Sequence, residues 1–287
     1  MSAKPPIRRK PAAIVAKERA RKAAARETVW LFGLHAVAAA LRNPARARLR
    51  LVVTKNAADR LADAIAESGM APEIADPRRF PAPLDPGSVH QGAALEARPL
   101  DWGRPEDRAL GARDVWVALD RVTDPHNVGA ILRSAAVFGA AAVLAPARHA
   151  APETGALAKA ASGALEAVPY LRVPNLGNAL AGLSARGLYL VGLAGEADRT
   201  LGAALAEAPP GPRGIVLGAR GPGCAAHAGS VPRSGADSRR QGFVSLNVSN
   251  AASVALYAAE AGLGDGARPE QPRRSRIDDR ISTPAQP

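Results

Sequence analysis

The second half of the chain alternates short apolar runs with helix-like patterns. Continuous apolar runs separated by amphipathic stretches indicate a parallel sheet covered by helices on both faces. Ligands of such sheets bind beyond the carboxyl ends of the strands, so the loops that follow strands are where functional residues are expected. The expected strands are 115–120, 141–146, 168–173, 188–194, 214–218 and 243–246, and the expected helices are 128–138, 154–166, 176–186, 201–207 and 249–261.

A smaller α/β pattern precedes this sheet, and we place a first domain at 29–100. A polar, Gly- and Pro-containing stretch, 101–114, reads as the linker to a second domain at 115–262. The first domain is expected to contain a helix at 33–41, a strand at 49–54, a helix at 56–69 with an Asn cap and a terminal Gly, and short strands in "APEIAD" and "GAALEARP".

Composition adds a partner to this picture. The 287 residues carry a formal net charge of +12, which favours a polyanion, nucleic acid before membrane. Nine Lys and Arg residues fall within 1–27, so we expect residues 1–28 to be a flexible basic arm that binds RNA, or else a solvated tail without a specific role. The tail 263–287 is expected to be disordered.

Several classes of protein are disfavoured by the sequence. The single cysteine, Cys224, excludes a disulfide within the chain. No apolar run approaches the roughly 20 residues that span a bilayer, and no apolar signal-peptide core precedes the first domain, so a cytoplasmic location without membrane contact is expected. The candidate loops contain no metal-ligand cluster and no carboxylate pair.

Polar residues gather in the loops after three expected strands. In the first, Asn127 is a natural N-cap for an apolar helix that ends at Gly139, and Arg133 within that helix is either a surface side chain or a phosphate ligand. The second loop, "GARGPG" (218–223), is neither a Walker A loop nor a dinucleotide fingerprint, but its glycines permit close approach of a ligand. The third places Ser245, Asn247, Ser249 and Asn250 where a single helix cap would suffice, which suggests a polar pocket.

These three loops resemble, in order and spacing, the signature motifs of the SpoU-type (TrmH-like) RNA 2′-O-ribose methyltransferases of the SPOUT superfamily. The motifs are "DPHNVGAILRSAAVFGA", "GIVLGARGPG" and "SLNVSNAASVALY", and the first domain, with "HAVAAAL" and "HQG", resembles the substrate-binding domain of the ribosomal branch. The resemblance implies a Rossmann-like parallel-sheet domain with a C-terminal trefoil knot, S-adenosylmethionine as cofactor, and a homodimer.

The resemblance also implies roles for individual residues. Asn127, Arg133, Ser245 and Asn247 would form the catalytic centre, with Arg133 holding a phosphate, and backbone around Leu217, Gly218, Gly221 and Leu246 would cradle the cofactor. No metal is implied. Ribosomal RNA, most simply a guanosine of 23S rRNA, is the expected substrate, with tRNA as the second choice.

One stretch departs from the family pattern. Arg220 stands where the family has Glu, and "CAAHAGSVPRSGADSRRQ" (224–241) lacks the expected apolar periodicity although the motif spacing is kept. Two compensating frameshifts or true divergence would explain this, and we expect 219–242 to be the least ordered part of the second domain. The alternative function is therefore a catalytically impaired RNA-binding protein that keeps the fold; a nucleotide-dependent oxidoreductase is disfavoured because the dinucleotide fingerprint is missing.

Overall fold

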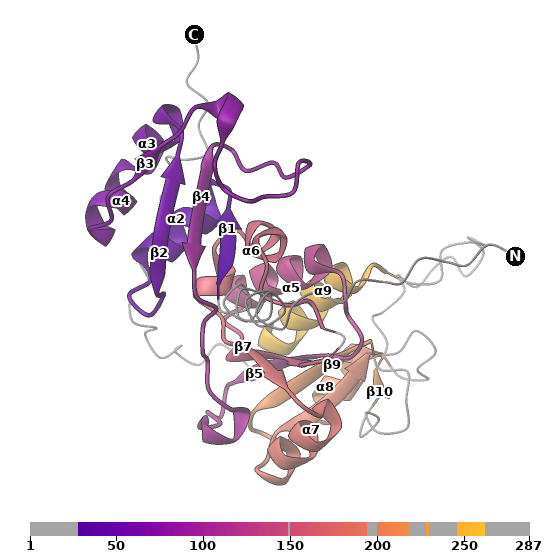
Figure 1. Cartoon of the computed structure of the whole chain (residues 1–287). Coiled ribbons are helices and arrows are strands. Elements are labelled where there is room, and N and C mark those ends of the chain that lie inside the picture. The colour runs from indigo at the N-terminus through magenta and orange to yellow at the C-terminus, as the bar shows by residue number, and fades with distance from the viewer. Residues whose placement is uncertain (1–27, 149, 194–199, 219–227, 230–245, 262–287) are drawn as a thin grey trace, which may run out of the picture.

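The fold is seen in a computed structural model that describes residues 28–148, 150–193, 200–218, 228–229 and 246–261 (Figure 1). The N-terminal part forms a four-stranded sheet in the order β1-β4-β2-β3, in which β4 is antiparallel to both β1 and β2, and β3 is parallel to β2. Its elements are β1 (Val29–Phe32), α2 (Leu34–Arg42), β2 (Arg48–Val53), α3 (Lys55–Arg60), α4 (Ala62–Ser68), β3 (Glu73–Ile74), η1 (Pro77–Arg79) and β4 (Ala93–Ala97).

The expected parallel sheet is confirmed in the C-terminal part. Its six strands are parallel and run in the order β10-β8-β9-β5-β6-β7. They are β5 (Val115–Leu119), β6 (Ala142–Pro146), β7 (Tyr170–Val173), β8 (Tyr189–Leu193), β9 (Arg213–Leu217) and β10 (Ala228–Gly229); the helical segments are η2 (Pro105–Asp107), α5 (Pro125–Val137), α6 (Gly155–Ala161), η3 (Ala164–Glu166), α7 (Leu176–Ala185), α8 (Leu201–Ala206) and α9 (Val248–Ala261).

Successive strand side chains face opposite sides of this sheet, and each side is buried. Val115, Val117 and Leu119 belong to one core with α5, α6, α8 and α9, whereas Trp116 and Ala118 belong to a second core with α7. Figure 1 shows α5, α6 and α9 between the six-stranded sheet and the N-terminal sheet, with α7 on the far face. The first core continues into the N-terminal part, so one apolar core joins the two sheets.

The structure differs from the sequence-based expectations at one helix cap, in the length of one helix and at one strand. Thr54, not Asn56, caps the first helix after β2, because its hydroxyl accepts the N–H of Ala57 at 3.3 Å. The helix expected over 154–166 is interrupted because Ser162 adopts a left-handed conformation at φ 49°. The strand β1 was not anticipated from the sequence.

The stretch expected as a linker, 101–114, packs against the end of α7. Arg186 at the end of α7 donates hydrogen bonds to the carbonyls of Pro105, Glu106 and Arg108, at 3.3, 3.2 and 2.5 Å. Trp102 contacts both cores.

Other expectations fall on residues that the structure does not describe. Of the strand expected at 243–246, residues 243–245 lie outside the described residues and Leu246 lies in the segment just before α9. Within 219–242, only Ala228 and Gly229 are described, and they extend the sheet by pairing with β8. The arm 1–27 and the tail 262–287 also lie outside the described residues. Among the helices that the structure describes, none is long and apolar enough to cross a membrane.

Candidate functional site

The carboxyl ends of β5 and β9 form the switch point of the parallel sheet. From β5 the chain continues to β6 and β7 at one edge, and then returns through β8 and β9 to the other side of β5. The order of the strands reverses at this point, and ligands of open α/β sheets bind beyond the carboxyl ends of the strands at such a point. The two strand ends are tied together, because the N–H of Asp120 donates to the carbonyl of Leu217 at 2.8 Å.

Gly218 turns the chain away from the end of β9 in a way that only glycine permits. Its φ is +83°, and a Cβ added there would lie 2.1 Å from the carbonyl oxygen of Asp120. Gly218 is exposed while Leu217 is 1% exposed, so what this loop offers to a ligand is backbone and not side chains.

The helix after β5 begins with Asp124 and not with the expected Asn127. The Asp124 carboxylate accepts the N–H groups of His126 and Asn127 at 3.1 and 3.3 Å, and Pro125 occupies the first helical position. Asn127 is therefore inside the first turn, half-buried, with its side chain not needed as a cap. The expected helix end is confirmed at Gly139, which has φ +66°.

The third loop leads into α9, and Asn247 caps that helix. Its side-chain oxygen accepts the N–H and the hydroxyl of Ser249, both at 2.8 Å, and its carbonyl accepts the N–H of Ala251. Leu246 beside it is 53% exposed. The remaining expected site residues, Ser245 and Gly221, lie outside the described residues.

Two side-chain contacts fix how α5 and α9 lie against each other. The hydroxyls of Ser134 and Ser253 are 2.7 Å apart, and the rings of Phe138 and Tyr257 meet edge to face with centroids 6.2 Å apart. Both partners advance by four residues, so the two helices run parallel and in register. Followed toward their N-termini, the two helices bring the first turn of α5 to the same end of the sheet as the start of α9.

The tertiary structure thus brings the first turn of α5, the start of α9 and the glycine turn after β9 to one end of the sheet. Ser134 and Ser253, which hold the two helices together, were missed from the sequence because a mid-helix serine gives no signal of its partner. Asp124 could have been recognised, since Asp-Pro before an apolar helix is a common start signal.

Arg133 lies on a different side of α5 from Asn127. Six residues of helix separate the two by about 120° around the axis and about 9 Å along it. The Arg133 side chain is exposed. Its charge acts on His35 at the start of α2, because burial first, and then the positive charges of Arg133 and Arg60, lower the pKa of His35. The charge of Arg133 therefore acts on the N-terminal part of the chain.

"HQG" has a structural role. The side-chain oxygen of Gln91 accepts the N–H of Leu34 at 3.1 Å and so caps α2, whose own cap residue, Gly33, makes no side-chain hydrogen bond. Gly92 packs on Thr54, with which it shares a backbone hydrogen bond of 2.8 Å.

The fold is that of a two-part α/β protein with a small mixed sheet followed by an open parallel sheet, and the candidate site lies at the switch point of the parallel sheet. Two family models match the chain. "SpoU rRNA Methylase family" covers residues 114–257, and "RNA 2'-O ribose methyltransferase substrate binding" covers residues 30–102. The chain belongs to the SpoU rRNA methylase family.

Named relatives resemble the chain over nearly their whole length. The 23S rRNA (guanosine-2'-O-)-methyltransferase of Salmonella typhimurium is 34% identical over 80% of this chain and 96% of its own. The corresponding enzyme of Ralstonia nicotianae is 36% identical over 80% of this chain and 94% of its own.

Solved structures share the fold at lower identity. The SpoU methyltransferase AviRb from Streptomyces viridochromogenes, in complex with the cofactor AdoMet, is 21% identical with a TM-score of 0.64, covering 85% of this chain and 92% of that one. The AdoMet-bound rRNA methyltransferase from Sinorhizobium meliloti is 20% identical with a TM-score of 0.64, covering 87% and 92%.

Proposed function

We propose that this protein transfers a methyl group from S-adenosylmethionine to the ribose 2′-hydroxyl of a guanosine in 23S ribosomal RNA. The relatives that are named for this activity match both parts of the chain, and the match includes 94–96% of their own length. The structural observation that supports it is the parallel α5–α9 pair, whose N-terminal ends, with Asn127 and Asn247, lie toward the switch point of the sheet.

The residues at the switch point suit such a cofactor. S-adenosylmethionine supplies a methyl group on a sulfonium, so a site for it needs neutral polar groups and accessible backbone. The exposed turn at Gly218 and the exposed Leu246 offer backbone, and Asn127 and Asn247 offer amides. We assign Leu217, Gly218 and Leu246 to the cofactor, together with Gly221 from the family motif.

In the reaction the ribose oxygen would gain the methyl group, the bond from that methyl to sulfur would break to leave S-adenosylhomocysteine, and the 2′-hydroxyl proton would pass to solvent. We assign Asn127, Asn247 and Ser245 to ordering the target ribose. For Arg133 we propose that its exposed guanidinium holds a phosphate beside the target, since an arginine keeps its charge and presents a fork of donors that matches phosphate.

The N-terminal part is the proposed RNA-binding domain. We place it at residues 29–100, with the basic residues 1–28 as an added RNA-binding arm, 101–114 as the connection and 115–262 as the methyltransferase domain with a C-terminal trefoil knot. The tail, residues 263–287, belongs to neither domain. A protein acting on ribosomal RNA in this way is expected to work in the cytoplasm.

We further propose a homodimer that uses the outer face of α5 and α9. Val137 and Tyr257 are 68% and 64% exposed, and Val254 is 39% exposed, although each is apolar. The Tyr257 ring contacts the Phe138 ring at the end of α5, so one of these exposed side chains lies where the two helices meet. Apolar residues gathered in this way mark interaction surfaces more often than scattered ones do.

The function is tested by incubating the purified protein with unmodified 23S rRNA and S-adenosylmethionine, and then mapping 2′-O-methylated positions by their resistance to alkaline cleavage. We expect one methylated guanosine, lost in Asn127→Ala. Calorimetry with S-adenosylmethionine separates the alternative: RNA binding without cofactor binding or methylation would identify a catalytically impaired RNA-binding protein.

A further inference from the structure

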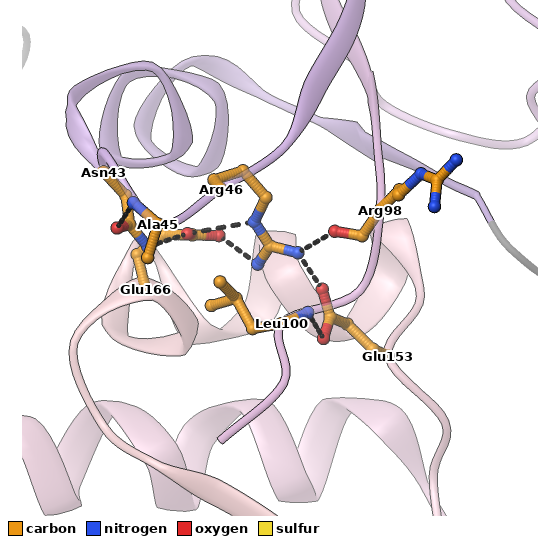
Figure 2. Close-up of polar contacts among 7 residues, drawn as sticks. All are labelled: Asn43, Ala45, Arg46, Arg98, Leu100, Glu153 and Glu166. Carbon is orange, nitrogen blue, oxygen red and sulfur yellow. Dashed lines mark hydrogen bonds and ion pairs between the residues drawn. The ribbon is translucent and has the colours of Figure 1, made fainter. Parts of the chain in front are cut away.

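A fully buried arginine connects the two parts of the chain. Arg46, in the loop between α2 and β2, has a side chain with 0% exposure, and it lies between two carboxylates of the C-terminal part (Figure 2). It binds Glu166 in η3 through two nitrogens, at 2.5 and 3.1 Å, and Glu153 in the loop before α6 through a third contact. It also donates to the carbonyl of Arg98 at 2.8 Å.

The two carboxylates have further donors, again from the N-terminal part. The side-chain amide of Asn43 donates to Glu166 at 2.7 Å, and the N–H of Leu100 donates to Glu153 at 3.2 Å. Figure 2 shows Asn43 beside Glu166 and Leu100 beside Glu153, with Arg46 between them. The two carboxylates thus come from one part of the chain and the groups that donate to them from the other.

A buried network of this kind fixes the relative position of the two parts more than it adds to the stability of their contact. Removing charges from water costs several kcal/mol per ion by rough estimate, so an apolar contact of the same volume would stabilise the junction as well or better. Burial opposes the charge on Arg46, but hydrogen bonding and attraction by Glu166 and Glu153 raise its pKa nonetheless. A planar guanidinium satisfies both carboxylates only in a narrow range of positions, whereas apolar contacts permit sliding.

The network leads directly to the helix with the candidate catalytic residues. Glu153 and Glu166 flank α6 in the chain, and α6 crosses α5 at Gly129, where an added Cβ would lie 2.5 Å from the Cβ of Ala160. On the other side, α6 begins against β1, because a Cβ at Gly155 would lie 2.3 Å from the carbonyl oxygen of Trp30. Helix α6 therefore packs closely against both the N-terminal sheet and α5.

We propose that Arg46 is a positioning residue, which through Glu153 and Glu166 fixes the RNA-binding domain in one orientation relative to the methyl-transfer site. RNA held by the N-terminal domain then presents its target ribose to Asn127 and Arg133 at a set distance. This inference rests on the proposed function for its effect on RNA, but not for its effect on domain orientation.

The test measures domain orientation and RNA kinetics in the full chain. Spin labels are attached at Asp63→Cys in α4 and Ser184→Cys in α7, both exposed positions, with Cys224→Ser to prevent a third label. We expect a narrow distribution of label distances for the wild-type sequence and a broad or displaced one for Arg46→Met. The matched control is Arg42→Met, which breaks an ion pair of 2.8 Å to Glu67 within the N-terminal part and should leave the distribution unchanged.

Kinetics supply the second measurement. For Arg46→Met, KM for a 23S rRNA fragment should rise by about tenfold or more, which corresponds to about 1.4 kcal/mol, while the Kd for S-adenosylmethionine stays within about twofold. If leaving two buried carboxylates unpaired prevents folding, the triple variant Arg46→Met, Glu153→Gln, Glu166→Gln removes all three charges and keeps acceptors for Asn43 and Leu100. In either folded variant, an unchanged distance distribution or an unchanged KM overturns the proposal. A wild-type protein that does not methylate refutes the proposed function instead, and the distance measurement still decides the orientation.

Discussion

Replacing Gly129 by Ala should destabilise this protein, whereas the same replacement at Gly182 should stabilise it. Both glycines lie within helices, Gly129 in α5 and Gly182 in α7. A Cβ at Gly129 would lie 2.5 Å from the Ala160 Cβ, 2.8 Å from the Leu157 carbonyl oxygen and 2.9 Å from the Ala161 nitrogen, whereas a Cβ at Gly182 meets nothing within 4 Å.

The magnitudes follow from two opposing effects. Ala is more favourable than Gly in a helix interior by about 1 kcal/mol, and this gain applies at both positions. Forcing a methyl group into a packed core costs about 1–3 kcal/mol, and the upper part of that range applies at Gly129 because two of the three close atoms are backbone and cannot rotate away. We therefore expect Gly129→Ala to lose about 1–2 kcal/mol net and Gly182→Ala to gain about 0.5–1 kcal/mol.

Thermal unfolding followed by circular dichroism measures both effects, with a shift of roughly 2–4 °C in Tm for each kcal/mol in a domain of 150–250 residues. Methyl transfer should also fall in Gly129→Ala, because α5, which carries Asn127 and Arg133, must move away from α6. If Gly129→Ala proves as stable as Gly182→Ala, helices α5 and α6 do not cross as closely as the distances at Gly129 require.

Four further predictions address the site and the arm. Arg133→Ala should lower methyl transfer by more than about tenfold and leave the calorimetric affinity for S-adenosylmethionine unchanged; retained turnover would refute the phosphate role. The same variant should raise the pKa of His35 in an NMR titration, since one of the positive charges that lower this pKa is gone. A His pKa that is lowered in the folded state makes the protein less stable as the pH falls from the ordinary His pKa through the folded-state pKa, so the wild type should lose stability on acidification and the variant should lose less. An unchanged His35 titration would place the Arg133 guanidinium elsewhere. Gly218→Ala should weaken cofactor binding and lower Tm, because the turn has φ +83° and no room for a Cβ; wild-type values for both would show that the turn has a different conformation. Deleting residues 1–27 should flatten the salt dependence of RNA binding, with a decrease in slope of roughly 0.7 for each phosphate that the arm neutralises, whereas an identical slope would mean that the arm does not bind phosphates.

The sequence alone determined the parallel sheet and the positions of most helices. Apolar runs of strand length that alternate with helical patterns have few other solutions, because both faces of such strands must be buried. The motifs in the loops after β5 and β9 were found for the same reason, since the carboxyl ends of parallel strands lie at one edge of the sheet. Local capping was less predictable: Asp124 and Asn127 are both good N-caps, and their sequence spacing does not say which one the helix will use.

Only the tertiary structure decided which of these residues meet. The register between α5 and α9 depends on Ser134 and Ser253, which are far apart in the chain and have ordinary helical neighbours. Arg133 lies toward the N-terminal part and not beside Asn127, because the pitch of the helix separates them. No local pattern in the sequence marks Arg46, Glu153 and Glu166 as partners. They form a buried network because α6 packs against the N-terminal sheet, and pairings between segments so distant in sequence are set by packing.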